Sequence, residues 1–312
     1  MVTRREFMAA TLLAARLKPR APADLMERAP TNLMEREALA ERMKFGYAAI
    51  TWGSNVSQAI DDIAAVGFRG IQLRGEAVAH FGARPRELRD TLARHQLTFA
   101  VLSSGNLSID PAREREMVAL HTGHAQFVRD AGGIYLQVID ERPKGRAVVA
   151  DDYSRLGRLM TELGKRTADL GIPLVYHHHM NSTGEKPQEV DAVLEAADPK
   201  HVRLLFDIAH YQQGGGDPVK AIRQYRSWIE VLHLKDVRPS GSGRSGGSGG
   251  YEFVELGRGR VDVTGVFAAL RDIAFDKWAI VELDRVPDPG RTPKESAEMN
   301  RRYLVDVIHE QI

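Results

Sequence analysis

Three residues in the second half of the chain are of types that bind metal ions and stand at the ends of short apolar runs. Asp207, His233 and Glu282 each lie in, or directly after, a segment that is otherwise apolar. Burying such polar groups in apolar strands costs several kcal/mol each unless they are paired or bind a cation. Together the three residues predict a site for a divalent metal ion.

A fourth ligand is expected from the end of one of two earlier strands. We expect Asp140 in this position, and Glu141 and His177 are the alternatives. The sequence contains no Cys, so every ligand must be an oxygen or a nitrogen atom. Mixed carboxylate and imidazole ligands suit Mn²⁺, Mg²⁺, Co²⁺, Fe²⁺ or Zn²⁺. We take Mn²⁺ as the first expectation.

The run His177-His178-His179 offers a proton acceptor beside this metal site. Side chains alternate along a strand, so His177 and His179 are assigned to the cavity and His178 to packing or to a bond with a ligand. We expect His177 or His179 to act as a base, because an imidazole titrates near neutral pH. Lys235 is expected to act as a general acid or to bind an oxyanion. Other strand ends are followed by Trp52, His80 and His210, which we expect to bind the substrate.

A fold that gathers strand ends at one rim is needed to bring these residues together. From Lys44 onward, short apolar runs alternate with longer helical patterns. The expected strands are 45–50, 70–73, 98–102, 134–139, 173–177, 202–206, 229–234 and 279–283. The expected helices are 56–65, 85–94, 112–130, 152–170, 187–197, 218–225, 263–273 and 293–310. Nearly continuous apolar strands are typical of parallel sheets covered on both faces. Eight such repeats favour a single-domain α/β fold, a (β/α)8 TIM barrel, over an open sheet of similar content.

The catalytic end of such a barrel is the end where the strands finish, and one unusual segment falls there. Residues 239–250 read PSGSGRSGGSGG, which is flexible by composition. The segment follows the seventh expected strand. We interpret it as either a mobile substrate lid or a disordered insertion.

The chain start resembles a bacterial twin-arginine export signal. The paired Arg4 and Arg5 precede Phe7 and the short apolar run 9–15. We therefore expect residues 1–43 to be a signal and tether, and residues 44–312 to be the barrel. The expected location is the periplasm, with the cytoplasm as the alternative.

The composition restricts the classes of partner that we expect for this protein. Lys and Arg number 43 against 42 Asp and Glu, a net charge of +1, which gives no support for a nucleic-acid partner. No apolar run reaches the roughly 18 residues of a transmembrane helix, so no span is expected in the mature chain. A small-molecule sugar substrate is the expected partner.

Three motifs resemble the sugar phosphate isomerase/epimerase superfamily, the xylose-isomerase-like TIM barrels. They are Tyr176-His177-His178-His179-Met180, Leu205-Phe206-Asp207 with His210, and Val231-Leu232-His233-Leu234-Lys235-Asp236-Val237. The branch that contains inosose dehydratase and exported 3-keto-glucoside hydratases or lyases is the most similar. This resemblance implies metal ligands at Asp207, His233 and Glu282, and frequent assembly into homo-oligomers.

The resemblance also implies chemistry next to a carbonyl. A base would remove a proton from the carbon beside the carbonyl of a keto-sugar, keto-glycoside or cyclitol, leading to elimination, hydration, isomerisation or epimerisation. Many family members supply a Glu from the fifth strand, where this chain has His177. This difference argues against an epimerase with two glutamates, and we place elimination or hydration first.

Other classes remain as alternatives. A metal-dependent hydrolase or endonuclease on the same barrel would need a basic groove or a larger metal cluster. A glycoside hydrolase could use Glu282 and Asp140 as paired carboxylates, but the histidines would then have no role. A non-catalytic periplasmic sugar-binding protein would not need the convergence of Asp, His and Glu.

Overall fold

Eight parallel strands close into a barrel in the computed structural model, which describes residues 43–240 and 250–312. Along the ring the order is β1-β2-β3-β4-β5-β6-β7-β10, and β10 pairs with β1 to close it. The strands are β1 (Lys44–Ala48), β2 (Gly70–Arg74), β3 (Thr98–Leu107), β4 (Tyr135–Asp140), β5 (Leu174–His177), β6 (Val202–Asp207), β7 (Ile229–Leu234) and β10 (Trp278–Val281). The predicted TIM barrel is confirmed, and the open sheet is excluded by the β1–β10 pairing.

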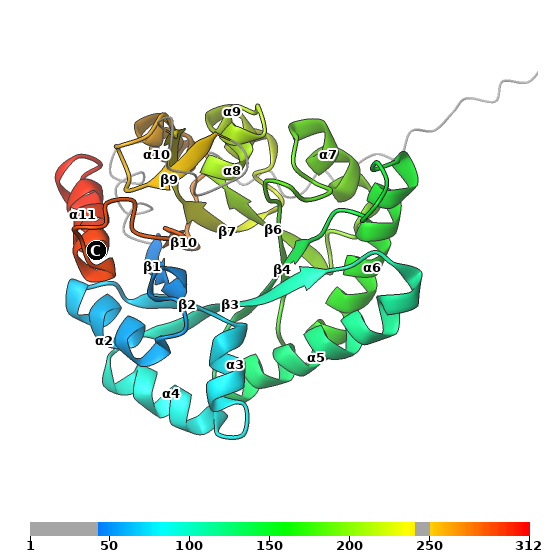
Figure 1. Ribbon diagram of the computed structural model, residues 1–312, viewed down its shortest axis with the longest axis horizontal. Helices are drawn as coiled ribbons and strands as arrows, with labels where there is room; N and C mark the ends of the chain where they lie inside the picture. Colours follow the sequence, from blue (N-terminus) through cyan, green and yellow to red (C-terminus); the bar gives the residue numbers. More distant parts are fainter. Residues whose placement is uncertain (1–42, 241–249) are drawn as a thin grey trace, which may run out of the picture.

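Helices surround this ring on its outer side (Figure 1). The α-helices are α2 (Val56–Val66), α3 (Gly75–Phe81), α4 (Pro85–Arg94), α5 (Glu114–Asp130), α6 (Ala150–Asp169), α7 (Pro187–Ala196), α8 (Ile208–Gln213), α9 (Pro218–Gln224), α10 (Val263–Asp272) and α11 (Pro293–Asp306). Two short 3-10 helices are η1 (Ala49–Trp52) and η2 (Pro111–Arg113). The apolar stripe of each long helix packs on the outer face of the strands, as Ile60 and Ile63 of α2 do.

Local sequence signals set where these helices begin and end. The side chain of Asn55 accepts a hydrogen bond from the backbone N–H of Gln58 and starts α2, which Gly67 ends at a φ of 108°. Thr292 and Glu295 form a capping box at the start of α11. These caps satisfy backbone groups that the helix itself leaves unpaired.

In the half of the barrel that lies away from the C-terminal ends of the strands, which we call the lower half, aliphatic side chains fill the inside. Val101, Val175, Leu205, Val231 and Ile280 pack together there. The same cluster includes the ring of Trp278, which lies over Gly70. A Cβ atom at Gly70 would lie 2.2 Å from that ring, so only glycine leaves room for it. The lower half is therefore a packed core with no channel.

A polar layer lies directly above this apolar core. On four strands, the residue two positions after an inward-facing core residue is polar. On β5 it is His177, two positions after Val175, and on β6 it is Asp207, two positions after Leu205. In the same way His233 follows Val231 on β7, and Glu282 follows Ile280 just past β10. The period of two along a strand thus delivers all four side chains to the barrel interior at its C-terminal end.

The sequence patterns did not predict four elements near this end. Helices α3 and α8 are short, and β8 (Asp236–Pro239) pairs antiparallel with β9 (Tyr251–Val254) as a hairpin after β7. Residues 241–249 of the Gly/Ser-rich segment lie outside the described residues, as do residues 1–42 of the expected signal and tether. The predictions of a lid and of a twin-arginine signal therefore stay predictions.

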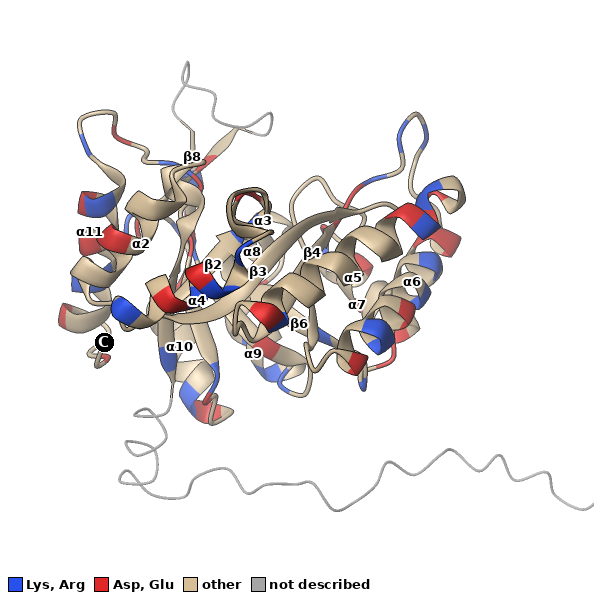
Figure 2. Ribbon diagram, turned by 90° about the horizontal axis from the view of Figure 1, so that it is seen from below, with Lys and Arg blue, Asp and Glu red and all other residues tan. Residues whose placement is uncertain are grey.

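The outer surface mixes the two signs of charge. Basic and acidic positions are interspersed along the outer helices, for example on α6 and α11 (Figure 2). In the described part of the chain, no helix combines the length and the apolar character needed to cross a membrane.

Candidate metal centre and active site

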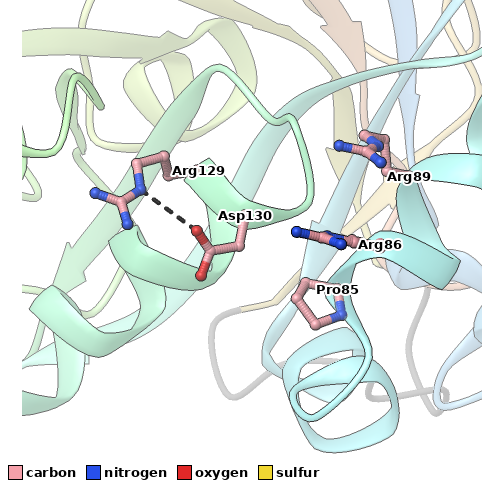
Figure 3. A pocket seen from close by; sticks show the side chains of 5 residues that line it. All are labelled: Pro85, Arg86, Arg89, Arg129 and Asp130. Carbon is pink, nitrogen blue, oxygen red and sulfur yellow. Dashed lines mark hydrogen bonds and ion pairs between the residues drawn. The ribbon is translucent and has the colours of Figure 1, made fainter.

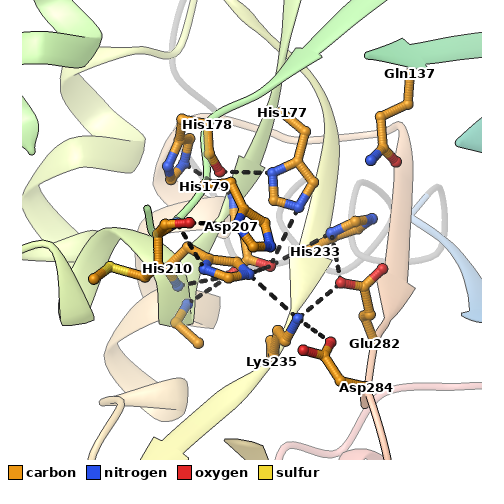
Figure 4. A network of polar contacts seen from close by, with 12 residues as sticks. Gln137, His177, His178, His179, Asp207, His210, His233, Lys235, Glu282 and Asp284 are labelled. Carbon is orange, nitrogen blue, oxygen red and sulfur yellow. Dashed lines mark hydrogen bonds and ion pairs between the residues drawn. The ribbon is translucent and has the colours of Figure 1, made fainter. Parts of the chain in front are cut away.

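Four buried side chains converge at the C-terminal end of the barrel (Figure 4). They are His177 from β5, Asp207 from β6, His233 from β7 and Glu282 from the residue after β10. One potential ligand atom from each lies within 4.8 Å of the others. We refer to these four residues as the metal group.

Hydrogen bonds fix which nitrogen of each histidine faces the centre. The Nδ1 atom of His177 lies 2.6 Å from the carbonyl oxygen of His178, which can only accept, so Nδ1 carries the hydrogen. On His233, Nε2 donates to Oε1 of Gln72 at 2.9 Å. The lone pairs of His177 Nε2 and His233 Nδ1 are therefore left for the centre. They lie 3.8 Å and 3.4 Å from Oδ2 of Asp207.

The carboxylates are held in a similar way from outside the centre. Asp207 is the N-cap of α8, and its Oδ1 accepts hydrogen bonds from the backbone N–H groups of Ala209 and His210. Its Oδ2 is buried and has no hydrogen-bond partner among the described residues. Oε2 of Glu282 accepts from Nε2 of Gln72 at 3.1 Å. One oxygen of Asp207 thus caps the helix, and the other is left to face the centre as a potential metal ligand.

Electrostatics keep this group deprotonated. Burial raises the pKa of Asp207, but His233 and Lys235 lower it by more, to about 2. Burial is the main reason that the pKa of His177 lies well below its ordinary value, and His233 lowers it further. The imidazole of His177 is thus neutral and the two carboxylates are charged near neutral pH, which is the state that metal ligands require.

The residues present fit a divalent cation. His233 Nδ1 and Asp207 Oδ2 are buried acceptors without a donor, and they lie 3.4 Å apart. Two such lone pairs repel each other unless a positive group lies between them. Two carboxylates with two imidazoles, held by hydrogen bonds from behind, match the ligand set and the supporting hydrogen bonds of a metal site.

Asp140, which we expected as the fourth ligand, lies outside the metal group and has other partners. Its Oδ1 accepts from the Tyr176 hydroxyl at 2.8 Å, and its Oδ2 accepts from the backbone N–H of Thr183. Both oxygens are used to tie β4 to the loop after β5. Glu141, the first alternative, pairs with Arg113 at 3.1 Å on the half-buried outer side. His177, the second alternative, is the residue in the metal group.

Lys235 is buried beside the metal group. Its Nζ donates to Oε1 of Glu282 at 2.8 Å and to Oδ1 of Asp284 at 2.5 Å, and it lies 4.1 Å from the centre of the Phe253 ring. Burial lowers the pKa of Lys235, but the carboxylates of Asp284 and Glu282 raise it by more, so the net pKa is above its ordinary value. The ammonium group is therefore a fixed positive charge at the edge of the site.

The other two histidines of the triple run point to opposite sides, as strand alternation predicts. His179 lines the cavity, and its Nδ1 lies 2.7 Å from the carbonyl oxygen of Met180, so its Nε2 is an acceptor. His178 is buried on the outer side, where its Nε2 accepts from the backbone N–H of Asp207 at 3.2 Å. His178 thus supports a member of the metal group from behind.

His210 packs against His179, with ring centres 3.8 Å apart. The backbone N–H of Met180 donates to Nδ1 of His210 at 3.2 Å, so Nε2 of the neutral ring carries the hydrogen. That nitrogen lies 4.0 Å from Oδ2 of Asp207 and 3.4 Å from Nζ of Lys235. His210 is thus a neutral donor at the edge of the metal group.

A cavity of about 540 Å³ opens in front of the metal group. Polar side chains from several strands and loops line it: Gln72, Arg74, Glu76, Ser103, Ser104, Asn106, Gln137, His177, His179, Glu282 and Asp284. The neutral amide and hydroxyl groups come from β2, β3 and β4, and the charged groups come from the end of β2, from α3 and from the segment after β10. Such a cavity is suited to a polyhydroxylated molecule of the size of a sugar.

None of the three residues expected at the substrate lines this cavity: His210 is buried beside the metal group, and Trp52 and His80 lie farther out. Trp52 packs edge-on against Tyr47, and its Nε1 donates to Asp62 on α2 at 2.8 Å, so it belongs to the outer core. His80 is exposed on α3 and packs edge-on against Phe81. Both follow strands in sequence, but the helical turns after β1 and β2 carry them away from the barrel axis.

Sequence reasoning missed two residues of the site. Gln72 connects His233 and Glu282, and the signal for it was a polar residue in an otherwise buried strand. Asp284 lines the cavity and pairs with Lys235, and the signal for it was its place two positions after Glu282.

A second cavity of about 480 Å³ lies between α4 and α5 on the outside of the barrel (Figure 3). Pro85, Arg86, Arg89, Arg129 and Asp130 line it, and Arg129 pairs with Asp130 at 3.3 Å. None of the candidate site residues predicted from the sequence lines this second cavity.

A model of the family described as "Xylose isomerase-like TIM barrel" matches residues 60–303, which contain all four residues of the metal group. The chain belongs to this family. The family expected from the motifs at Tyr176–Met180 and around Asp207 and His233 is thereby confirmed.

Curated relatives cover nearly the whole barrel. The inosose dehydratase of Lacticaseibacillus casei is 27% identical over 297 residues, which span 84% of this chain and 96% of the relative. The inosose dehydratase of Geobacillus kaustophilus is 26% identical over 316 residues, which span 88% of this chain and 97% of the relative. The predicted likeness to the branch with inosose dehydratase is confirmed.

Solved structures share the fold. A crystal structure of the IOLI protein with a zinc atom has a TM-score of 0.73 at 19% identity and covers 86% of this chain and 99% of its own. The probable 3-DHS dehydratase AsbF from Bacillus anthracis has a TM-score of 0.68 at 17% identity and covers 84% and 99%. With its family and its metal group, the chain is an enzyme of the isomerase or dehydratase type with a residue group that fits a divalent metal ion, so the expectation of an enzyme is confirmed.

Proposed function

We propose that this protein is a metal-dependent dehydratase that removes water from a keto-cyclitol or a related keto-sugar. The metal group of His177, Asp207, His233 and Glu282, beside a cavity whose lining is rich in amide and hydroxyl groups, is the observation that carries the proposal. The relatives named inosose dehydratase support the substrate class. Elimination or hydration of a keto-glycoside is the alternative, and it would use the same chemistry beside a carbonyl.

In this proposal His177 is the fourth ligand, in the place that we first expected for Asp140. A divalent cation held by the metal group would act as a Lewis acid on a substrate carbonyl and so acidify the neighbouring C–H. The mixed ligand set suits several metals, and we propose Mn²⁺ as the first to test, followed by Zn²⁺, Co²⁺, Fe²⁺ and Mg²⁺.

His179 is the proposed base. Its Nδ1–H is committed to the carbonyl oxygen of Met180, so its Nε2 lone pair is available to take a proton from the carbon beside the substrate carbonyl. With His177 assigned to the metal, His179 is the imidazole in the cavity wall that remains for this step.

Lys235 is the proposed acid. Its ammonium group, held between Glu282 and Asp284, would protonate or hydrogen-bond the hydroxyl that leaves as water from the β carbon. His210 would present its Nε2–H to a substrate oxygen. An acceptor at His179 and donors at Lys235 and His210 fit a 1,2-elimination, which needs a base and an acid in opposite protonation states. Epimerisation at one carbon would instead need a base on each face.

Export through a twin-arginine signal, residence in the periplasm and assembly into a homo-oligomer remain predictions from the sequence. They affect where the enzyme works and leave the chemistry at the metal group unchanged.

Solvent exchange tests the proposal. The purified protein is loaded with Mn²⁺ and incubated with inosose, a polyhydroxylated cyclohexanone, in D2O. We expect deuterium at the carbon beside the carbonyl and formation of the dehydrated product. Chelation, or the change Glu282→Gln, should abolish both while the circular dichroism of the barrel is retained. If no ketose or keto-cyclitol exchanges deuterium with any of the five metals, the proposed chemistry is wrong.

A further inference from the structure

Gln137 on β4 is a buried amide that the mechanism above does not use. It is 1% exposed and lines the cavity in front of the metal group. In the ring of eight strands, β4 and β10 are four positions apart in both directions, so Gln137 lies across the barrel from Glu282. Figure 4 shows its amide end pointing toward the side of His233 and Glu282.

One end of this amide has a protein partner and the other does not. Nε2 donates to Oγ of Ser103 at 3.3 Å, whereas Oε1 is buried without a hydrogen-bond partner among the described residues. Exchanging the two ends of the amide would satisfy Ser103 equally well and leave Nε2 unpaired instead. In both orientations one polar group of Gln137 lacks a partner, and leaving a buried polar group unpaired costs about 1–3 kcal/mol.

The surroundings indicate what kind of group pairs with this amide. A hydroxyl can donate to an amide oxygen or accept from an amide nitrogen, so it fits either orientation. Carboxylate or phosphate groups would need a cation. Within the described lining of the cavity the positive side chain is Arg74, which pairs with Glu76 at 3.5 Å, and Glu282 and Asp284 add negative charge.

We propose that Gln137 is a specificity-determining residue that binds a hydroxyl group of the substrate at the end away from its carbonyl. This inference rests on the proposed function and adds to it that the distal end of the substrate is a neutral polyol. Gln137 is not a member of the metal group and its amide forms no hydrogen bond with it, so the role that we assign to Gln137 is substrate recognition.

The test compares a ketone that has distal hydroxyls with one that has none. Inosose carries them, and 2-hydroxycyclohexanone has only the carbonyl and one neighbouring hydroxyl. For Gln137→Met we expect KM for inosose to rise about tenfold, the effect of losing one neutral hydrogen bond, with kcat and bound metal nearly unchanged. Deuterium exchange of 2-hydroxycyclohexanone should be unchanged. Gln126→Met, on the outside of α5, is the matched control and should leave both ketones unaffected.

Two results would overturn the inference. One is an equal loss on both ketones, because it would mean that Gln137 acts on the reacting end or on the fold. The other is no change with inosose. If the wild-type protein turns over neither ketone, the proposed function fails, and calorimetric binding of myo-inositol then decides the inference by itself. Binding that Gln137→Met weakens supports the subsite, and equal or undetectable binding by both proteins overturns it.

Discussion

Gln72 on β2 holds two members of the metal group at once, from a strand two positions from β10 in the ring. Its Oε1 accepts from Nε2 of His233 at 2.9 Å, and its Nε2 donates to Oε2 of Glu282 at 3.1 Å. One neutral amide therefore selects the tautomer that leaves Nδ1 of His233 free and fixes the rotation of the Glu282 carboxylate. Residues in this supporting position commonly change metal affinity by about 10- to 100-fold.

Replacing Gln72 should weaken the metal site without removing a ligand. For Gln72→Leu we expect metal affinity to fall about 10- to 100-fold, because His233 and Glu282 lose the partner that orients them. Competition with a chromogenic chelator measures the affinity. Gln126→Leu on the outer helix α5 serves as the control. Equal affinity for Gln72→Leu and the wild-type protein would show that the two ligands are held by packing alone.

The barrel and the convergence of Asp207, His233 and Glu282 could be predicted from the sequence because each depends on a short-range pattern. A core residue such as Leu205 and a metal-group residue such as Asp207 are two positions apart, so the strand period by itself places both in the interior. The short elements α3 and α8 lack such a pattern. They depend on how the chain turns after a strand.

The choice between Asp140 and His177 could not be made from the sequence. Both stand at the end of a buried strand, and β4 and β5 are neighbours. What separates them is a long-range contact: the hydroxyl of Tyr176 and the backbone N–H of Thr183 occupy both oxygens of Asp140. Strand alternation places Tyr176 on the face away from His177, but it does not tell which carboxylate the hydroxyl reaches.

The different roles of these two residues can be separated by substitution. His177→Gln should lower the bound metal well below one ion per chain, since it removes a ligand atom. Asp140→Asn should leave the bound metal unchanged and lower the free energy of unfolding by about 1–3 kcal/mol, because an amide has one oxygen to accept from two donors. Metal analysis and urea unfolding provide the two readouts. Loss of metal in Asp140→Asn would return Asp140 to the position of fourth ligand.

Replacing Lys235 should lower kcat strongly and leave the metal bound. Its ammonium contacts Glu282 and Asp284, and its removal deletes the donor that we assign to the leaving hydroxyl. For Lys235→Met we expect kcat to fall about 10²- to 10⁴-fold, the usual contribution of a general acid, with metal still bound. Lys220→Met, at an exposed lysine on α9, is the control. Turnover within a few-fold of wild type in Lys235→Met would assign the proton donor to another residue, with His210 the first to test.

His121 on α5 should make the stability of the fold depend on pH. Burial is the main reason that its pKa falls from 6.5 to about 4, and His124, which shares the hydroxyl of Ser104 with it, lowers the pKa further. Between pH 6.5 and 4 the unfolded chain binds this proton and the folded chain does not. The stabilisation is therefore fully present above pH 6.5 and is lost as pH falls toward 4, by about 3 kcal/mol in all.

The variant His121→Gln isolates this contribution from the other buried histidines. Urea unfolding of the wild-type protein, His121→Gln and the exposed-site control His80→Gln is measured across the window from pH 6.5 to 4, with a chelator present throughout. We expect the free energy of unfolding to fall less steeply with decreasing pH in His121→Gln than in the wild-type protein, because a glutamine takes up no proton in either state. His80→Gln should follow the wild-type slope. Parallel slopes for all three proteins would mean that His121 binds its proton equally in the folded and unfolded chains, against the burial that surrounds it.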